Sequence, residues 1–445
     1  NLLAKKVYSE PEASAHTEDD RIDDIKRLLH GYQRQIDGLA STTAAAEREQ
    51  VTATSEVIVL TGSTGTVGSF LLDHLMESPA VSHIYCLNRA QDSRASQTAR
   101  NKIKKLSHVL PQEKVTFLKT DLTKELLGLD TAVYKILAER TTQIIHTAWP
   151  VNFNHPLSYF APSLTGVLNL LKLAHTAQQN PTLLFLSSIS AVSAYHSLPA
   201  ASTAPCSPVP EEIITDPACT AAMGYGESKY LAERILDYAC DRLRVTCGIA
   251  RIGQVCGTAA DPRAWNKAEW LPSLIVSSRY LETLPASLGG GQYDQIDWIP
   301  VDLLAPVLTE LSSALSVAAG SLRAVRVFHC VNPHRVAWQA LAPVVVKELA
   351  RSRHVGNGDG GPAIVPLSEW VQKLHTAVDS QGPHVDFDTN PAAKLVEFYE
   401  QLLAVSALDG VRLSTAGTLQ VSKALSALHA VRPEWLQGWI REWLD

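Results

Sequence analysis

The stretch VIVLTGSTGTVGSFLLDHL, residues 57–75, joins a short apolar run to a helical period through three regularly spaced glycines. A dinucleotide-binding turn uses glycine at such places: Gly62 for the tight turn, Gly65 for close approach of a pyrophosphate, and Gly68 for packing of helix on strand. Amide groups at the start of the helix would face the phosphates. The stretch therefore predicts a strand, a phosphate-binding loop and a helix. The remaining expected loop contacts are Thr64 and Val67.

Further along the chain, short apolar runs rich in β-branched residues alternate with stretches of helical period. Strands that are buried on both faces and separated by helices form a parallel sheet with helices on each side. The predicted fold class is therefore α/β, a Rossmann-type doubly wound parallel sheet with a smaller, mainly helical C-terminal lobe. The expected strands are 57–60, 84–88, 115–120, 143–148, 183–188, 245–252 and 325–331.

The expected domain boundaries follow from where this alternation begins and ends. The expected units are a nucleotide-binding domain at 51–257, completed by about 296–333, and a substrate-binding lobe at 258–295 and 334–445. Residues 1–50 are a linker region with an amphipathic helix predicted at 21–39, whose apolar stripe needs a surface to lie on. Because the chain opens on the apolar NLLAKKV, as if in mid-helix, it looks like a piece cut from a longer polypeptide.

The composition argues against several function classes. A formal charge of −6 disfavours a nucleic-acid surface, and the basic run ARNKIKKL (99–106) is interpreted as a solvated helix face. No stretch is long and apolar enough to span a membrane, and the start does not resemble a signal peptide. The seven cysteines show no CxxC spacing. Neither a metal site nor a disulfide framework is therefore expected, and the compartment is interpreted as reducing and cytoplasmic.

The end of the second strand distinguishes between the two nicotinamide dinucleotides. An acidic residue there would accept a hydrogen bond from the ribose 2′-hydroxyl of NADH, whereas arginine accommodates the 2′-phosphate of NADPH. The sequence YCLNRA (85–90) ends in Asn88 and Arg89, with no carboxylate before Asp92. NADPH is therefore the predicted cofactor. The alternative is that Arg89 is an ordinary solvated residue at a strand end.

Three polar side chains are expected to meet beside the nicotinamide. The fifth strand ends in LFLSSISA (184–191), which places Ser188 at the carboxyl edge of the sheet, where ligands bind in such folds. Tyr225 and Lys229 follow on the next long helix, one turn apart on one face. In a carbonyl-reducing site Lys229 would hold the cofactor ribose and lower the pKa of Tyr225, which would donate its proton. Ser188 would donate a second hydrogen bond to the oxygen that gains charge.

This order of glycine loop, serine-bearing strand and YxxxK resembles that of the extended short-chain dehydrogenase/reductases. More narrowly, residues 55–445 resemble the terminal thioester reductase domains of fungal adenylate-forming reductases and related synthetases. The narrower resemblance rests on IIHTAWPVNFN (144–154), RIGQVCG (251–257), EWLPSLIVSSRYLETLP (269–285), DWIPVDLLA (297–305), FHCVNPHRVAWQ (328–339) and DTNPAAKLVEFY (388–399).

The resemblance implies NADPH-dependent reduction of a phosphopantetheine-bound acyl thioester to an aldehyde, with further reduction to an alcohol left open. It implies Ser188, Tyr225 and Lys229 as the catalytic triad, with Ser190 as a rival hydroxyl. The implied partners are upstream carrier and adenylation or synthase domains of the same polypeptide, and the opening segment would end the carrier domain. The excised domain is expected to be a monomer. Further implied cofactor contacts are Asp121 and Leu122 beside the adenine, and His146, Thr147 and Ala148 near the ribose and nicotinamide.

Two other functions remain open from the residues alone. A sugar-nucleotide epimerase or dehydratase could use the same scaffold, although Arg89 and the tryptophan-rich second lobe weigh against it. A non-catalytic dinucleotide-binding or cyclising domain would typically lack Tyr225 or Lys229, and both are present. His329 and Cys330 are interpreted as core residues rather than ligands. Three tryptophans are interpreted either as a substrate wall or as packing: Trp265, Trp270 and Trp298.

Overall fold

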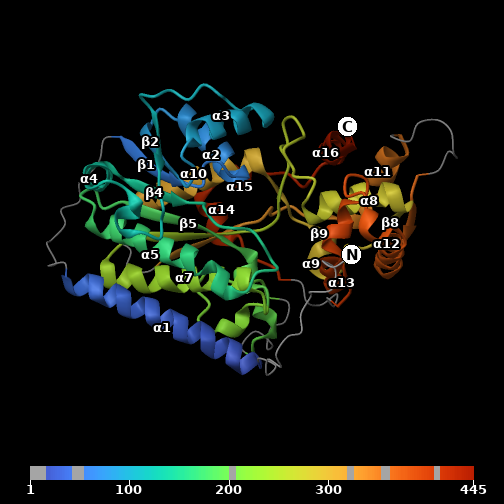
Figure 1. Cartoon of the computed structure of the whole chain (residues 1–445), viewed down its shortest axis with the longest axis horizontal. Coiled ribbons are helices and arrows are strands. Elements are labelled where there is room, and N and C mark those ends of the chain that lie inside the picture. Colours follow the sequence, from blue (N-terminus) through green and yellow to red (C-terminus); the bar gives the residue numbers. More distant parts are fainter. Residues whose placement is uncertain are drawn as a thin grey trace.

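The apolar runs of the sequence form one parallel sheet, with strands in the order β11-β6-β5-β4-β1-β2-β3 (Figure 1). The computed structural model describes residues 17–42, 55–199, 207–317, 325–351, 361–404 and 411–444. All seven predicted strands are present, and the α/β prediction is confirmed. Their bounds are β1 Glu56–Thr61, β2 Val81–Asn88, β3 Val115–Lys119, β4 Gln143–His146, β5 Thr182–Ser188, β6 Cys247–Ile252 and β11 Arg326–Cys330.

The two faces of the sheet belong to two different hydrophobic cores. On β1, Val57 and Val59 point into the core formed with one helical layer, whereas Ile58 and Leu60 point into the core on the opposite face. Successive side chains of a strand alternate between faces, so a continuous apolar strand supplies both cores. This explains why the sequence shows unbroken apolar runs rather than an apolar–polar alternation.

Helices cover both faces of the sheet (Figure 1). One layer contains α2 (Thr66–Glu77), α3 (Ser93–Ile103) and α10 (Val301–Val317). The other layer contains α4 (Thr131–Arg140), α5 (Ala161–Thr176) and α7 (Gly224–Leu243).

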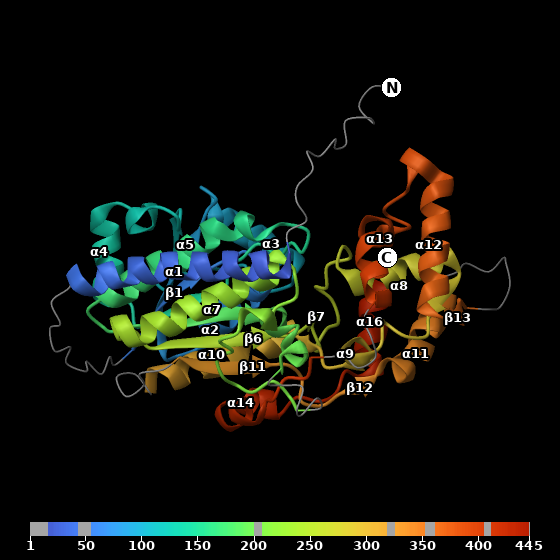
Figure 2. The ribbon, with the colours of Figure 1, turned by 90° about the horizontal axis from the view of Figure 1, so that it is seen from below.

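The N-terminal helix α1 (Glu18–Thr42) lies along α7 in both views (Figures 1 and 2). Most of its predicted apolar stripe is confirmed, because Ile25, Leu29, Tyr32 and Ile36 are buried in the core that α5 and α7 share with the sheet. Two further members of the stripe are not buried: Ile22 is partly exposed and Leu28 is exposed. Residues 1–16 and 43–54 lie outside the described residues, so the predicted end of a carrier domain at the start of the chain receives no structural description.

A second group of helices builds a separate core at one side of the sheet domain (Figure 1). Its largest buried side chains are tryptophans, among them Trp338, Trp370 and Trp439. Its helices are α8 Trp270–Leu281, α9 Gly291–Asp294, α11 Trp338–Arg351, α12 Leu367–Gln381, α13 Val396–Ala404 and α16 Pro433–Leu444. Short strand pairs join these helices to one another and to the sheet domain: β7 Val255–Cys256, β8 Thr283–Pro285, β9 Gln295–Ile296, β10 Ile299–Pro300, β12 Val336–Ala337 and β13 Ala363–Val365.

One segment lies apart from the lobe to which the sequence assigned it. Residues 411–428, expected in the substrate-binding lobe, contain α14 (Ala416–Val421) and α15 (Lys423–Ser426), and both pack on α10 of the sheet domain. Leu413 and Leu425 are buried in the two cores of the sheet. The helices are so short that their apolar residues do not reveal which core they join. Within the described ranges, no helix combines the length and the apolar character that a membrane crossing needs.

Candidate active site

The glycine loop between β1 and α2 has the geometry of a phosphate cradle. Gly62 has a φ of +72°, a region that favours glycine, and an added Cβ would lie 2.6 Å from Thr147 Oγ1. An added Cβ at Gly68 would collide with the carbonyl of Gly62, so this glycine lets α2 pack against the turn itself. Gly65 precedes the first turn of α2, whose free amide groups and dipole favour an anion. These residues fit a dinucleotide pyrophosphate.

Hydrogen bonds between strand ends hold other predicted cofactor residues beside this loop. Thr61 Oγ1 accepts from the backbone N–H of Thr147 and of Ala148, each at 3.2 Å. Thr147 Oγ1 donates to the carbonyl of Thr61 at 2.7 Å. On the other side, Asn88 Nδ2 donates to Ser63 Oγ at 2.9 Å. The ends of β1, β2 and β4 therefore lie together, as the sequence predicted for the cofactor edge.

The predicted adenine-side residues lie at the ends of β2 and β3. Arg89 is exposed. Hydrogen bonds from Thr123 hold the pKa of Asp121 below its usual range, and the positive charges of Lys124 and, to a smaller extent, Arg89 lower it further. Leu122 packs against Gly166 of α5. Among the remaining predicted contacts, Thr64 lies in the glycine loop and Val67 in the first turn of α2, partly buried against the core.

Two cations that the sequence interpretation left on a solvated face contact the glycine loop instead. Arg100 Nη1 donates to the carbonyl of Thr64 at 3.1 Å. Lys104 Nζ donates to the carbonyl of Gly65 at 3.1 Å and to Ser69 Oγ at 3.0 Å. Burial lowers the pKa of Lys104 to about 8. The sequence could have indicated these contacts, because Arg100 and Lys104 are four residues apart at the end of the helix that follows the second strand.

The three predicted catalytic side chains meet at the carboxyl edge of the sheet. Tyr225 lies in the first turn of α7, and its side chain is buried. Ser188 ends β5, hydrogen-bonds with Tyr225, and donates to Ser190 Oγ at 3.2 Å. Lys229 Nζ donates to the carbonyl of Leu186 at 2.6 Å. The rival hydroxyl of Ser190 is therefore an immediate neighbour of Ser188.

Burial dominates the electrostatics of this catalytic group. It raises the pKa of Tyr225 to about 12, although the neighbouring hydroxyl of Ser188 acts in the opposite direction. The expected lowering of this pKa by Lys229 is not seen. Lys229 is itself fully buried, and burial lowers its pKa well below the usual value, which weakens the positive charge it presents. Tyr225 is consequently a protonated phenol at neutral pH and a hydrogen-bond donor.

Aromatic rings surround the amine of Lys229. Its Nζ lies 4.4 Å from the ring centroid of Trp149 and 4.6 Å from that of Phe185. His146 stacks on Phe185 with centroids 5.7 Å apart, and its Nδ1 and Thr61 Oγ1 form a hydrogen bond of 2.8 Å. Burial and the charge of Lys229 together lower the pKa of His146 to about 3, so the imidazole is neutral. The imidazole of His146, which the resemblance places near the cofactor ribose and nicotinamide, is therefore buried and neutral. It contacts Trp149 and Phe185, the same rings that surround the amine of Lys229.

A buried polar chain extends from the catalytic strand across the sheet. Ser187 Oγ donates to Glu233 Oε1 at 2.6 Å, and Arg251 Nη2 donates to Glu233 Oε2 at 2.7 Å. Arg251 Nη1 donates to His329 Nε2 at 3.2 Å, and His329 Nδ1 donates to the carbonyl of Ser414 at 2.6 Å. Sequence reasoning missed this chain, although Glu233 lies one helical turn beyond Lys229.

Several other residues were interpreted from the sequence as packing residues, and most of them lie in buried positions. His329 and Cys330 are buried in the sheet, and among the described residues no group of His, Cys, Asp and Glu could hold a metal ion. Trp265 and Trp298 are buried against each other, with ring centroids 5.3 Å apart. Trp270 is partly exposed, and its indole donates to Gln254 Oε1 at 2.9 Å.

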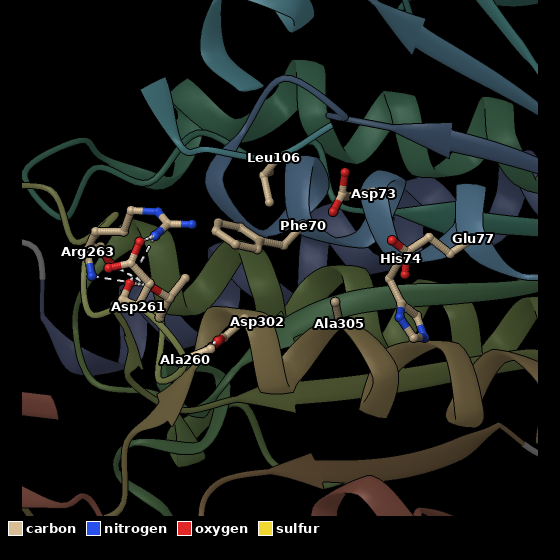
Figure 3. A pocket seen from close by; sticks show the side chains of 11 residues that line it. Phe70, Asp73, His74, Glu77, Leu106, Ala260, Asp261, Arg263, Asp302 and Ala305 are labelled. Carbon is tan, nitrogen blue, oxygen red and sulfur yellow. Dashed lines mark hydrogen bonds and ion pairs between the residues drawn. The ribbon is translucent and has the colours of Figure 1, made fainter. Parts of the chain in front are cut away.

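A cavity of about 230 Å³ lies away from this edge, between α2, α10 and the loop around Asp261 (Figure 3). None of the predicted site residues lines it. Two of its charged groups have partners: Asp261 pairs with Arg263, and Asp302 accepts from the backbone N–H of Ala259 at 3.0 Å. These two carboxylates are therefore already engaged within the protein.

Comparisons with known proteins agree with this geometry. Residues 60–308, more than half of the chain, match the model of an NAD-binding family described as "Male sterility protein". A carboxylic acid reductase of Neurospora crassa is 37% identical over 422 residues, which are 94% of this chain and 37% of the relative. The chain thus spans little more than a third of that relative.

Two solved structures share the fold. The terminal R domain from the myxalamid PKS-NRPS pathway aligns with a TM-score of 0.67 at 22% identity, covering 92% of this chain and 96% of that one. A thiolation-reductase di-domain from an archaeal non-ribosomal peptide synthetase aligns with a TM-score of 0.63 at 17% identity, covering 94% and 82%.

Proposed function

The chain belongs to this NAD-binding family of male sterility proteins, and from that premise we propose that it uses NADPH to reduce a carrier-bound acyl thioester to an aldehyde. The observation that carries the proposal is the meeting of Ser188, Tyr225 and Lys229 at the sheet edge that also holds the glycine loop. The name of the Neurospora crassa relative, a carboxylic acid reductase, supports the same chemistry.

Two of the three catalytic side chains, Tyr225 and Ser188, act on the carbonyl oxygen in this proposal, and Lys229 would hold the cofactor ribose. A bound nicotinamide in its reduced form would supply the hydride. Tyr225, a protonated phenol, donates to the carbonyl oxygen of the thioester while that oxygen gains negative charge. Ser188 is the second donor, since it is the hydroxyl that hydrogen-bonds with Tyr225. When the carbonyl re-forms, the carbon–sulfur bond breaks and the thiolate leaves, so the product is an aldehyde.

The preference for NADPH rests on cations beside the predicted phosphate positions. Arg89 follows β2 directly, and no carboxylate ends that strand to accept a hydrogen bond from a ribose 2′-hydroxyl. Arg100 and Lys104 add two positive charges from α3 and the residue after it, each within hydrogen-bond distance of a glycine-loop carbonyl. Together they favour the cofactor that carries an additional phosphate.

The proposed partner is a carrier domain that precedes this chain in a longer polypeptide. The first turn of α1 lies at the catalytic end of α7, where Arg21 Nη1 donates to Glu227 Oε1 at 3.0 Å and to Thr220 Oγ1 at 3.1 Å. A carrier domain attached before α1 would therefore be tethered at the end of the molecule where Tyr225 lies. The thiolation-reductase di-domain with the same fold supports this arrangement.

The test compares thioesters with free acids. The purified chain is expected to oxidise NADPH with acyl-pantetheine or acyl-coenzyme A and to leave the matching acids unreduced, because a carboxylate already carries negative charge and lacks a thiolate leaving group. Absorbance at the NADPH band and detection of the aldehyde are the measurements. Reduction of free acids without ATP would contradict the proposal. Conversion of a sugar nucleotide without net NADPH oxidation would favour the epimerase alternative.

A further inference from the structure

The loop after β4 is anchored to the catalytic helix at two points. Trp149 Nε1 donates to Ser228 Oγ at 3.3 Å, and Ser228 Oγ donates to the carbonyl of Tyr225 at 2.7 Å. Farther along, the loop backbone at His155 and Leu157 approaches Gly224 so closely that any side chain at position 224 would collide with it. Residues 150–154, here named the arch, span these two anchors and thus have little freedom to move away from Tyr225.

The arch presents apolar side chains to solvent beside the catalytic phenol. Phe153 is 45% exposed, and its ring stands perpendicular to that of Tyr225 with centroids 5.2 Å apart. On another side, the ring of Tyr225 contacts Phe160, which is fully buried. Val151 is even more exposed than Phe153. Ligand sites are lined mainly by apolar and aromatic side chains that lie around a few polar groups, and Phe153 beside Tyr225 fits such a lining.

One polar group of the arch is already paired within it. Asn152 Oδ1 accepts from the backbone N–H of Asn154 at 2.9 Å, so the carbonyl oxygen of this side chain is used within the arch itself. A charged or strongly polar group held against Phe153 and Val151 would lose water without gaining a partner from them.

We propose that Phe153, with Val151 beside it, is the surface that contacts the acyl group next to the reacting carbonyl and selects apolar acyl groups, aromatic or long-chain. The proposal rests on the function proposed above and adds the substrate class to it. The thioester carbonyl has to reach the hydroxyl of Tyr225, and Phe153 contacts the ring that carries this hydroxyl. An apolar acyl chain that leaves the carbonyl along the arch would bury the exposed part of Phe153.

The experiment measures NADPH oxidation by the full chain with acetyl-, octanoyl- and benzoyl-pantetheine. Phe153→Ala is expected to lower kcat/KM for the octanoyl and benzoyl thioesters roughly 10- to 200-fold, the range for lost apolar contacts in a binding pocket, and to leave the acetyl thioester little changed. Phe153→Leu should recover part of the loss. Tyr159→Ala is the matched control, because Tyr159 is 48% exposed on the same loop but stacks on His155, with centroids 3.8 Å apart.

The outcomes separate the two proposals. Equal losses for all three thioesters in Phe153→Ala would show that Phe153 positions Tyr225 rather than contacting the acyl group, and would overturn the inference. A shift of selectivity as large in Tyr159→Ala would also overturn it. If the unaltered chain oxidised NADPH with none of the thioesters, the proposed function itself would fail, whatever the arch does.

Discussion

At the glycine-loop half of the sheet edge, the groups that would face a cofactor are backbone amides and cations near the surface. Arg89 and Arg100 are exposed, and the loop depends on Gly62 and Gly68 for its shape. At the catalytic half, Tyr225 and Lys229 are buried among aromatic rings. The ion pair between Glu233 and Arg251 is buried as well. One half would bind a charged cofactor at a solvated surface, whereas the other half places its polar groups in a dry environment.

Because of this difference, substitutions in the two halves should have different effects. Charge interactions at a surface are screened by water and salt, so single substitutions there change affinity by moderate amounts. In a dry site a lost charge or hydrogen bond leaves its partner without water, and the cost is larger. We therefore expect the catalytic half to lose stability or turnover, and the glycine-loop half to lose cofactor affinity.

The largest expected effect is on stability, from Glu233→Ala. The substitution leaves the fully buried guanidinium of Arg251 without its partner, so the free energy of unfolding should fall by about 3–5 kcal/mol. Urea denaturation measures it. Asp37→Ala is the control, because it breaks only an exposed pair with Arg242 and a hydrogen bond from the Tyr238 hydroxyl, and it should cost much less stability. Similar losses in the two variants would abolish the contrast between a buried and an exposed ion pair.

The next effect is on turnover, from Tyr225→Phe. Removing the phenol hydroxyl while keeping the ring should lower kcat by about 10²-fold or more and leave NADPH binding nearly intact. Steady-state kinetics and fluorescence titration with NADPH give the two quantities. Tyr230→Phe, on the same helix, removes a hydroxyl that donates to the carbonyl of Thr215 and accepts from Arg234, and this variant should keep its turnover. A Tyr225→Phe variant with a near-normal rate would remove the basis of the catalytic assignment.

On the glycine-loop half, Arg89→Ala should weaken NADPH binding by roughly 1.5–3 kcal/mol, the size of a hydrogen bond to a charged group. NADH lacks the 2′-phosphate and is the internal control, so its dissociation constant should hardly change. Calorimetric titration with both cofactors tests this. Equal weakening of the two would mean that Arg89 supports the strand end rather than a phosphate.

The smallest effect concerns pH. With its pKa lowered to about 8 by burial, Lys104 is charged below that pH and neutral above it. If its charge helps to hold the phosphates, NADPH affinity should be constant below pH 8 and fall above it, by at most about tenfold per pH unit for one linked proton. Lys104→Arg keeps the charge and should flatten the profile. An unaltered chain with the same affinity at pH 7 and pH 9.5 would exclude Lys104 from cofactor binding.

Features that depend on neighbours along the chain were predictable from sequence. The seven strands follow from apolar runs of fitting length, and the glycine loop follows from its spacing between a strand and a helix. Tyr225 and Lys229 lie on one face because four residues make about one helical turn. The position of Ser188 was predictable because the carboxyl ends of all strands in a parallel sheet lie along the same edge.

Contacts between distant segments were decided by the tertiary structure. Glu233 and Arg251 pair across a helix and a strand, Lys104 reaches back to Gly65, and Phe153 lies over Tyr225 because Gly224 admits the loop backbone. The burial that raises the pKa of Tyr225 on α7 includes ring contacts with Phe153 and Phe160 of the segment between β4 and α5. The sequence by itself determined the fold class and the edge where the chemistry lies, since both follow from local periodicity. Packing between segments far apart in the chain decided the charges and the shape of the site, because no local pattern encodes which side chains exclude water from one another.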